Sequence, residues 1–180
     1  MHVFITGAAT GIGEATVESL HRKYHSAGFT IVDKNQQALQ DVCQRLTVRG
    51  IRAHGIACDL TDIDGLPDVV RRAQADMGDI ELLVNNAGVM LVEDFSRMSW
   101  EKGMLQMNLN TIAPLRLIHS ILPGMLERGR GGIINIASMA ARSRARAAAS
   151  HRSINPAKYR RSLSVMAPPV FCGSSVMERA

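Results

Sequence analysis

The sequence contains no long hydrophobic run. None of its segments comes near the roughly 20 consecutive apolar residues that a helix needs to cross a bilayer, although 46% of its 180 residues are hydrophobic. The N-terminus also lacks a basic segment leading into an apolar core, which is the pattern of a secretory signal. We therefore expect a cytoplasmic protein without membrane contact, with enough apolar residues for the core of one ordinary domain.

Cysteine is scarce. The chain has three cysteines, Cys43, Cys58 and Cys172, which is an odd number without the close spacing of metal ligands. They are typical of reduced cysteines that serve as small apolar residues. The sequence therefore predicts no metal site.

Acidic residues are nearly absent from the C-terminal part. Residues 128–180 hold ten Lys and Arg but one acid, Glu178, a balance of +9, whereas residues 1–127 hold 11 basic and 15 acidic residues, a balance of −4. The net charge of +5 thus belongs to the C-terminal part alone. The basic stretch ARSRARAAASHR has no aromatic residues that could stack on bases, so nucleic acid is not an expected partner.

Strand-like and helix-like segments alternate along the first 138 residues. Short runs rich in β-branched and apolar residues predict strands, and apolar positions three and four apart predict helices. The expected strands are 2–6, 29–33, 51–59, 80–88 and 131–138, and the expected helices are 12–24, 35–50, 62–77 and 104–126. This order predicts an α/β fold with a Rossmann-type, doubly wound parallel sheet.

A glycine-rich segment, TGAATGIG (6–13), lies between the first strand and the first helix. Its three glycines permit a tight turn, close approach of the backbone to a pyrophosphate, and close packing of helix on strand. The helix that follows would offer free N–H groups and a partial positive charge to an anion. The candidate dinucleotide-binding residues here are Thr6, Gly7, Gly11, Ile12 and Gly13.

Asp33 ends the second strand, 20 residues after Gly13. A carboxylate at this place accepts hydrogen bonds from an adenosine ribose and repels a 2′-phosphate, which favours NAD over NADP. The neighbouring Lys34 could tolerate the phosphate, so NADP remains possible. The alternative interpretation is a helix start with turn glycines and a surface aspartate.

Three motifs together resemble the short-chain dehydrogenase/reductase family. They are T-G-x-x-x-G-x-G in residues 6–13, CDLTD (58–62) and NNAG (85–88), in order at the ends of predicted strands. The resemblance covers about residues 2–140 and implies hydride transfer between a nicotinamide cofactor and an alcohol or ketone, by a protein whose family members form homo-oligomers. It also implies further residues along the cofactor, namely Asp59 and Leu60 at the adenine, and Asn85, Ala87 and Gly88 beside the fourth strand.

The long predicted helix carries a polar residue on an apolar face. Met104, Asn108, Ile112 and Leu115 share this face at spacings of four and three. The family places an asparagine here that helps to hold a proton-relay water, and Asn108 matches it. The alternative is a core asparagine bonded to the backbone. Asn110 lies off this face, and we expect it only to be exposed.

Ser138 stands where the family keeps the serine that bonds the substrate oxygen, or else it is simply a polar residue ending a strand. The family's tyrosine should follow about a dozen residues later, with a lysine four residues further, because a cation must lower the tyrosine pKa from about 10 for acid–base work. The chain has no Tyr-x-x-x-Lys: His151 stands 13 residues after Ser138, and Lys158 precedes Tyr159. His151 could be a substitute acid, but a lone histidine in such a basic stretch is more often simply solvated. Only Ser138 and Asn108 therefore remain as catalytic candidates.

From Met139 onward the alternation of strands and helices stops. We predict a dinucleotide-binding domain in residues 1–140, with a sheet incomplete at its C-terminal side, and a poorly ordered basic tail in residues 141–180. The break has two explanations: a shift of reading frame near residue 141 that truncates the chain, or a natural short variant whose tail binds an acidic partner. The predicted function is a short-chain dehydrogenase, and the rival is a non-catalytic dinucleotide-binding or interaction protein. We expect this chain to dimerise only weakly, because the helix through which family members commonly pair is missing.

Overall fold

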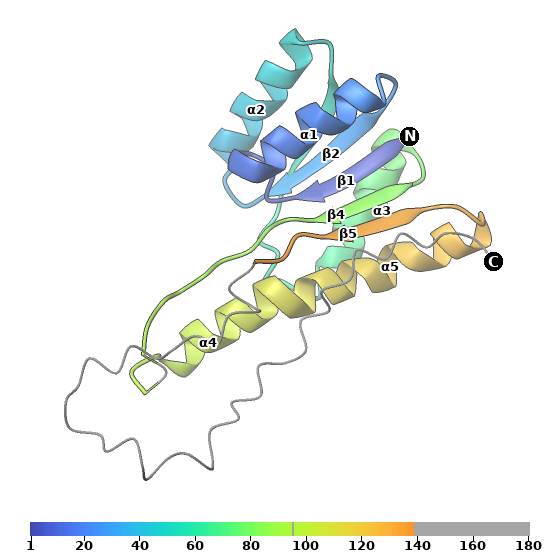
Figure 1. Cartoon of the computed structure of the whole chain (residues 1–180). Coiled ribbons are helices and arrows are strands. Elements are labelled where there is room, and N and C mark those ends of the chain that lie inside the picture. Colours follow the sequence, from blue (N-terminus) through green and yellow to red (C-terminus); the bar gives the residue numbers. More distant parts are fainter. Residues whose placement is uncertain (95, 139–180) are drawn as a thin grey trace. The chain divides into compact units, whose positions relative to one another are not determined.

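A computed structural model describes residues 1–94 and 96–138, in which five parallel strands form one sheet in the order β3-β2-β1-β4-β5 (Figure 1). The strands are β1 (His2–Thr6), β2 (Gly28–Asp33), β3 (Arg52–Ala57), β4 (Leu82–Asn85) and β5 (Gly132–Asn135), and the helical segments are α1 (Gly11–Lys23), α2 (Gln36–Val48), α3 (Leu66–Met77), α4 (Trp100–Met107), the π-helix η1 (Asn108–Ile112) and α5 (Ala113–Glu127). The chain runs outward from β1 to β3 and then returns to the other side of β1 for β4. This confirms the predicted Rossmann-type α/β class.

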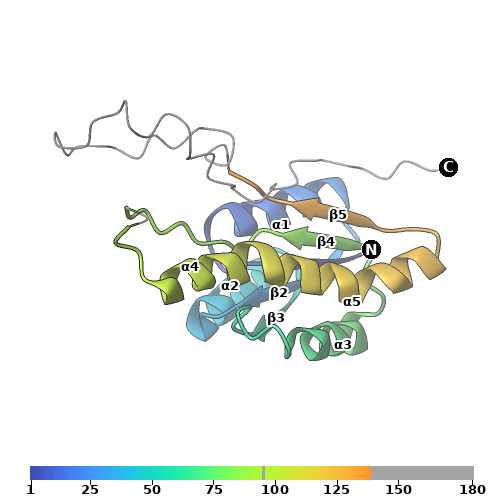
Figure 2. The same cartoon turned by 90° about the horizontal axis from the view of Figure 1, so that it is seen from below.

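Two hydrophobic cores cover the two faces of the sheet, because successive side chains of a strand point to opposite sides. Val3 and Ile5 of β1 pack in the core under α1 and α2, whereas Phe4 between them packs in the core under α3 and α5. Figure 2 shows α3 and α5 together on their side of the sheet. All three β1 residues are completely buried, so β1, the middle strand of the sheet, contributes to both cores.

β5 is the last strand of the sheet in the described part of the chain, and one of its faces is open. Ile133 packs against the core under α3 and α5, whereas Ile134 and Ile136 are 41% and 43% exposed. Residues up to Ile136 belong to one compact unit, and Ala137 and Ser138 lie outside it. The sheet is thus incomplete beyond β5, as predicted, and the tail predicted in residues 141–180 lies outside the described residues.

The third helix begins later than predicted. The sequence pattern favoured a start at residue 62, but α3 begins at Leu66. The intervening residues are held in turns by their own carboxylates, because Asp59 Oδ1 accepts from Thr61 N (2.9 Å) and Asp62 Oδ1 accepts from Gly65 N (3.3 Å). Aspartate side chains that bond nearby backbone N–H groups compete with helix formation in this way.

The long helix predicted over 104–126 is interrupted by the π-helix η1. Pro114 has no N–H to donate to Asn110 one α-turn earlier, and Ala113 N donates to Asn108 O, five residues back. The wider turn rotates the buried face, which consists of Ala113, Leu117, Ile121 and Met125. Ile112 and Leu115 are instead 37% and 56% exposed. The prediction that they share an apolar stripe with Asn108 was therefore wrong, because it assumed an uninterrupted α-helix.

The remaining expectations from composition concern membranes, metals and thiols. No helix among residues 1–94 and 96–138 is long and apolar enough to span a bilayer. The same residues contain no cluster of His, Cys, Asp or Glu suited to a metal ion. Cys43 and Cys58 are free, half-buried thiols, and burial raises the pKa of each, while Cys172 lies outside the described residues.

We expect the buried His2 to make the fold less stable at mildly acidic pH. Its Nδ1 donates to Gly78 O (2.8 Å) and its Nε2 lies 2.8 Å from Thr30 Oγ1, and burial lowers the pKa of His2 below its usual 6.5. The neutral ring therefore contributes stability that is complete above about pH 6.5 and is lost as the pH falls through the lower folded-state pKa. The free energy of unfolding in urea should drop between pH 7.5 and pH 5.5.

The variant His2→Phe tests the source of that drop. It should unfold with a shallower dependence on pH than the unmodified chain, whereas His25→Phe, at an exposed histidine, should keep the full dependence. An unchanged slope in His2→Phe would assign the effect to other groups.

Candidate functional site

The candidate residues gather at the carboxyl end of the sheet. Parallel strands all present their carboxyl ends at one edge, and the strand order reverses direction at β1, between β2 and β4. Crevices at such a switch point are the usual ligand sites of open α/β sheets. The glycine-rich segment follows β1, Asp33 ends β2, Asp59 follows β3, and Ala87 and Gly88 follow β4 (Figure 1).

The three glycines of the loop have different roles. A Cβ on Gly7, whose φ is +63°, would lie 2.7 Å from Ala87 Cα, and a Cβ on Gly13 would lie 2.6 Å from both Ala8 Cα and Gly7 O. These two glycines pack the loop against α1 and the segment after β4. Gly11 also has a positive φ, +62°, but a Cβ there would meet nothing within 4 Å. Gly11 therefore leaves open space at the start of α1.

Thr6 and Asn86 tie the glycine loop to the end of β4. Thr6 Oγ1 accepts from Asn86 N (3.1 Å) and Ala87 N (3.0 Å), and Asn86 Nδ2 donates to Thr6 O (2.9 Å) and Gly7 O (2.8 Å). Thr6 is buried, so these hydrogen bonds link the glycine loop to the segment after β4 from within the fold. Sequence reasoning did not single out Asn86, although it stands inside the NNAG motif.

Asn85 also lies inside the framework. Its side chain is only 4% exposed, and its Nδ2 donates to Asn135 Oδ1 of β5 (2.9 Å). Its own Oδ1 is buried without a partner among the described residues. Asn85 thus joins β4 to β5, next to Asn86, which fastens the glycine loop.

The start of α1 is suited to an anion. Its N-cap residue, Thr10, makes no side-chain capping bond, so the first N–H groups of the helix are left for another acceptor. The adjacent Ile12 is 69% exposed. Glu14, the acid of the first turn, is engaged by Arg45 NH2 at 2.8 Å. Together with the open space at Gly11, these features fit a pyrophosphate at the positive end of the helix.

Asp33 is oriented toward the same loop. Its Oδ1 accepts from Asn35 N (3.1 Å) and its Oδ2 accepts from Ala9 N (3.4 Å). The residue is half-buried, and the adjacent Lys34 is exposed. A carboxylate has about four acceptor sites, so Asp33 can still accept hydrogen bonds from a ligand that reaches it from the glycine loop.

The two residues expected at an adenine differ in exposure. Asp59 is exposed, and hydrogen bonds from the backbone N–H and hydroxyl of Thr61 lower the pKa of its carboxyl. Leu60 is only 6% exposed and packs in the core under α3 and α5. Asp59 therefore presents a charged group in the turn after β3, while the Leu60 side chain anchors this turn in the core.

Asn110 holds the segment that follows β4. Its Oδ1 accepts from Val89 N (2.9 Å) and its Nδ2 donates to Val89 O (2.7 Å). A Cβ on Gly88 would lie 3.3 Å from Asn110 Oδ1, so this contact also needs the small neighbour. Gln106 adds a second tie, with Oε1 accepting from Leu91 N at 2.9 Å. Asn110 is exposed, as predicted, but it has a specific structural role that the sequence pattern did not reveal.

We expect Asn110→Ala to loosen this segment. The change removes both partners of the Val89 backbone, which should cost about 1 kcal/mol of unfolding free energy and speed exchange of the Val89 amide hydrogen severalfold. Hydrogen–deuterium exchange measures the second effect directly. Thr111→Ala, at the next position of η1, should leave the exchange of Val89 unchanged, and equal protection of Val89 in both variants would contradict the role of Asn110.

The two catalytic candidates differ in how they are placed. Asn108 begins η1 and is half-buried, and its side chain forms no hydrogen bond with another residue of the described ranges. Its amide is thus available to a water or ligand. Ser138 follows β5 by three residues, is exposed, and lies outside the compact unit that ends at Ile136. His151 and Tyr159 lie outside the described residues.

The chain is similar in sequence to known proteins. The sequence model of the short chain dehydrogenase family matches residues 1–151. A fatty acyl-CoA reductase of Mycobacterium tuberculosis is 38% identical over 140 residues, which are 76% of this chain and 46% of that protein. A gluconate 5-dehydrogenase of Gluconobacter oxydans is 32% identical over 138 residues, 75% of this chain and 52% of the relative. The chain thus spans about half the length of the curated relatives it matches.

The chain is also similar to solved structures of oxidoreductases. The L-sorbose reductase of Gluconobacter frateurii, complexed with NADPH and L-sorbose, superposes with a TM-score of 0.73 at 31% identity, covering 78% of this chain and 53% of that one. A metagenomic short-chain oxidoreductase in complex with NADP has a TM-score of 0.74 at 29% identity, covering 79% and 64%. By fold, motifs and sequence similarity, the chain belongs to the short-chain dehydrogenase family.

Proposed function

We propose that the protein is an NAD(P)-dependent oxidoreductase that transfers hydride between a nicotinamide cofactor and an alcohol or ketone. The observation that carries the proposal is the anion cradle after β1, where Gly11 leaves open space and the first turn of α1 has no side-chain cap. Similarity to oxidoreductases, two of them in complex with NADPH or NADP, supports it. When bound, the cofactor would supply the hydride donor or acceptor.

The residues of this chain would bind and orient that cofactor. The N–H groups at Gly11, Ile12 and Gly13 would hold the pyrophosphate, and the segment with Ala87 and Gly88, fastened by Asn110, would border the nicotinamide half. Such orientation lowers a barrier by itself. Asn108 would help to hold a proton-relay water, and Ser138 would bond the substrate oxygen.

For cofactor choice we propose a preference for NAD, with Asp33 accepting from the ribose hydroxyls. The similar structures in complex with NADPH or NADP and the exposed Lys34 beside Asp33 favour NADP instead. The two proposals make opposite predictions for one substitution, because a carboxylate attracts a ribose hydroxyl and repels a phosphate.

We expect Asp33→Ala to weaken NADH binding about tenfold, since a hydrogen bond to a charged acceptor is worth about 1.5–3 kcal/mol. NADPH binding should stay the same or improve. Fluorescence titration of the purified chain with each reduced cofactor measures both. Asp41→Ala, at an exposed acid of α2, is the charge-matched control. Equal affinity of the unmodified chain for NADH and NADPH would refute the role of Asp33.

A second candidate function is non-catalytic dinucleotide binding, with the basic residues 141–180 as a contact for an acidic partner. The absence of Tyr-x-x-x-Lys from the sequence favours it. Absorbance of the reduced cofactor with a panel of alcohols and ketones separates the two functions, because only the oxidoreductase changes it. Size-exclusion chromatography in the same buffer would show whether the chain forms the homo-oligomer that the family resemblance implies.

A further inference from the structure

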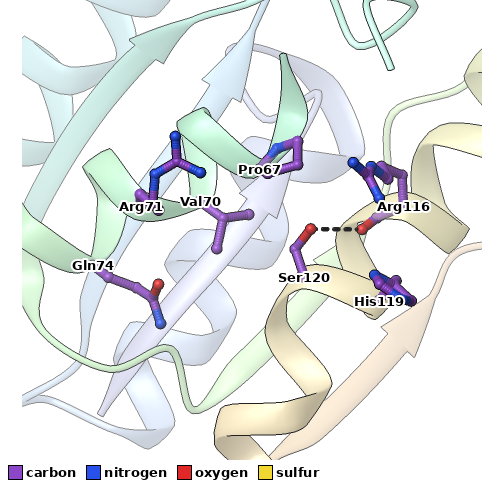
Figure 3. A pocket seen from close by; sticks show the side chains of 7 residues that line it. All are labelled: Pro67, Val70, Arg71, Gln74, Arg116, His119 and Ser120. Carbon is purple, nitrogen blue, oxygen red and sulfur yellow. Dashed lines mark hydrogen bonds between the residues drawn. The ribbon is translucent and has the colours of Figure 1, made fainter. Parts of the chain in front are cut away.

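A pocket of about 330 Å³ lies between α3 and α5. Figure 3 shows its lining: residues of α3 on one side face residues of α5 on the other. The lining residues are Pro67, Val70, Arg71, Gln74, Arg116, His119 and Ser120. None of them belongs to the glycine loop or to the segment after β4, and the volume is at the lower end of the range of small-molecule sites.

The pocket is rich in hydrogen-bond donors and has no acid in its lining. Two arginines, a histidine, a serine and a glutamine contribute polar groups. The Arg71 guanidinium forms an ion pair with Asp68 outside the pocket. Arg116, in contrast, has no carboxylate within ion-pair distance among the described residues.

Arg116 is the most informative residue of the pocket, because part of its guanidinium group is buried without a hydrogen-bond partner among the described residues. Its Nε is buried and donates no hydrogen bond to a protein acceptor in the described ranges. Buried donors of charged groups are normally paired. The neighbouring Ser120 hydroxyl donates to the Arg116 carbonyl at 2.9 Å, which fixes its position one turn further along α5.

We propose that this pocket binds a phosphate group, either free phosphate or the head of a small phosphomonoester. The planar guanidinium of Arg116 matches the spacing of two phosphate oxygens. The Gln74 amide and the His119 ring lie on opposite walls and can donate to the remaining oxygens, and Arg71 adds a second positive charge. The apolar Val70 and Pro67 leave room for the carbon stem of an ester.

The test is a titration of the full 180-residue chain, followed by the Nε–H resonance of Arg116 in ¹H–¹⁵N spectra. The probes are inorganic phosphate and glycerol 3-phosphate, each against sodium chloride of equal ionic strength. Arg116→Gln should weaken phosphate binding at least tenfold. Arg22→Gln, which removes the same charge from α1 on the other face of the sheet, should change it less than twofold.

Two further measurements keep the outcome decisive. Arg116→Lys keeps the positive charge but lacks the planar guanidinium group, so it should also lose most of the affinity for phosphate. Thermal unfolding of each variant tests whether its fold is intact. Tighter binding of the ester identifies a phosphomonoester, whereas binding of inorganic phosphate alone identifies the free anion. The proposal is overturned if Arg116→Gln binds as well as the unmodified chain, if chloride gives the same shifts, or if saturation with NADPH abolishes binding, which would place the phosphate at the glycine loop.

Discussion

Replacing Gly13 by alanine is expected to destabilise the protein by about 2–3 kcal/mol and to abolish cofactor binding. The new Cβ would lie 2.6 Å from Ala8 Cα and from Gly7 O, and both are backbone atoms that cannot turn aside. Overpacking of this kind typically costs about 1–3 kcal/mol. The glycine loop would have to move away from α1, and with it the N–H groups that we propose to hold the pyrophosphate. Urea unfolding and titration with NADH measure the two effects.

Two other glycines serve as matched controls. In Gly11→Ala the new Cβ would lie in open space, so only the positive φ of +62° opposes the change. This backbone conformation should cost alanine about 1–2 kcal/mol of stability. It should reduce stability less than Gly13→Ala does. Gly103→Ala, in α4 with nothing within 4 Å of its Cβ, should be neutral or stabilising, by about 0.5–1 kcal/mol. A Gly13→Ala protein as stable as Gly103→Ala would show that the loop does not pack as described.

The second large effect concerns turnover. The polypeptide of 180 residues should bind the cofactor yet catalyse hydride transfer about 10²–10⁴-fold more slowly than a chain that contains the tyrosine and lysine, because that factor is typical of general acid–base catalysis. Its sequence has the residues that we propose to orient the cofactor and to bond the substrate oxygen, but no Tyr-x-x-x-Lys to move the proton. Absorbance of the reduced cofactor with a panel of ketones measures the rate.

The comparison chain follows from the proposed shift of reading frame. Reading the coding DNA in the other frame after Ala140 should reveal a Tyr-x-x-x-Lys, and the resulting protein should gain activity that a Tyr→Phe change removes. His151→Ala and Tyr159→Phe in the present chain are the controls. Robust turnover of the 180-residue chain that either control abolishes would mean that its C-terminal part is catalytic after all.

The features that were predictable from the sequence are those with a local pattern. Runs such as HVFIT predicted β1 because a strand buried on both faces is continuously apolar, and the glycine spacing predicted the loop after it. Side chains that act across the fold left no such signal. Asn110 bonds Val89, 21 residues earlier, and Asn86 bonds Gly7, 79 residues earlier, so only the folded chain shows what they hold.

The two wrong predictions about helices, namely the buried face of residues 104–126 and the start of α3, also have physical causes. Periodicity along residues 104–126 was interpreted with 3.6 residues per turn, but the π-helix at Asn108–Ile112 changes the phase. Pro114 was the available clue, because a proline inside a helix must disturb the bonding one turn earlier. The start of α3 was misplaced for a similar reason, since Asp59 and Asp62 bond the backbone locally.

The open side of β5 has a consequence for the behaviour of the chain in solution. Its outer edge pairs with no strand in the described residues, and GIINIAS (132–138) is apolar, rich in β-branched residues, and free of charge and proline. Segments of this kind at an exposed edge are templates for intermolecular strand addition and for fibril growth. A β5 edge left without a partner strand should therefore favour aggregation, so solubility at high concentration reports on this edge independently of any enzymatic assay.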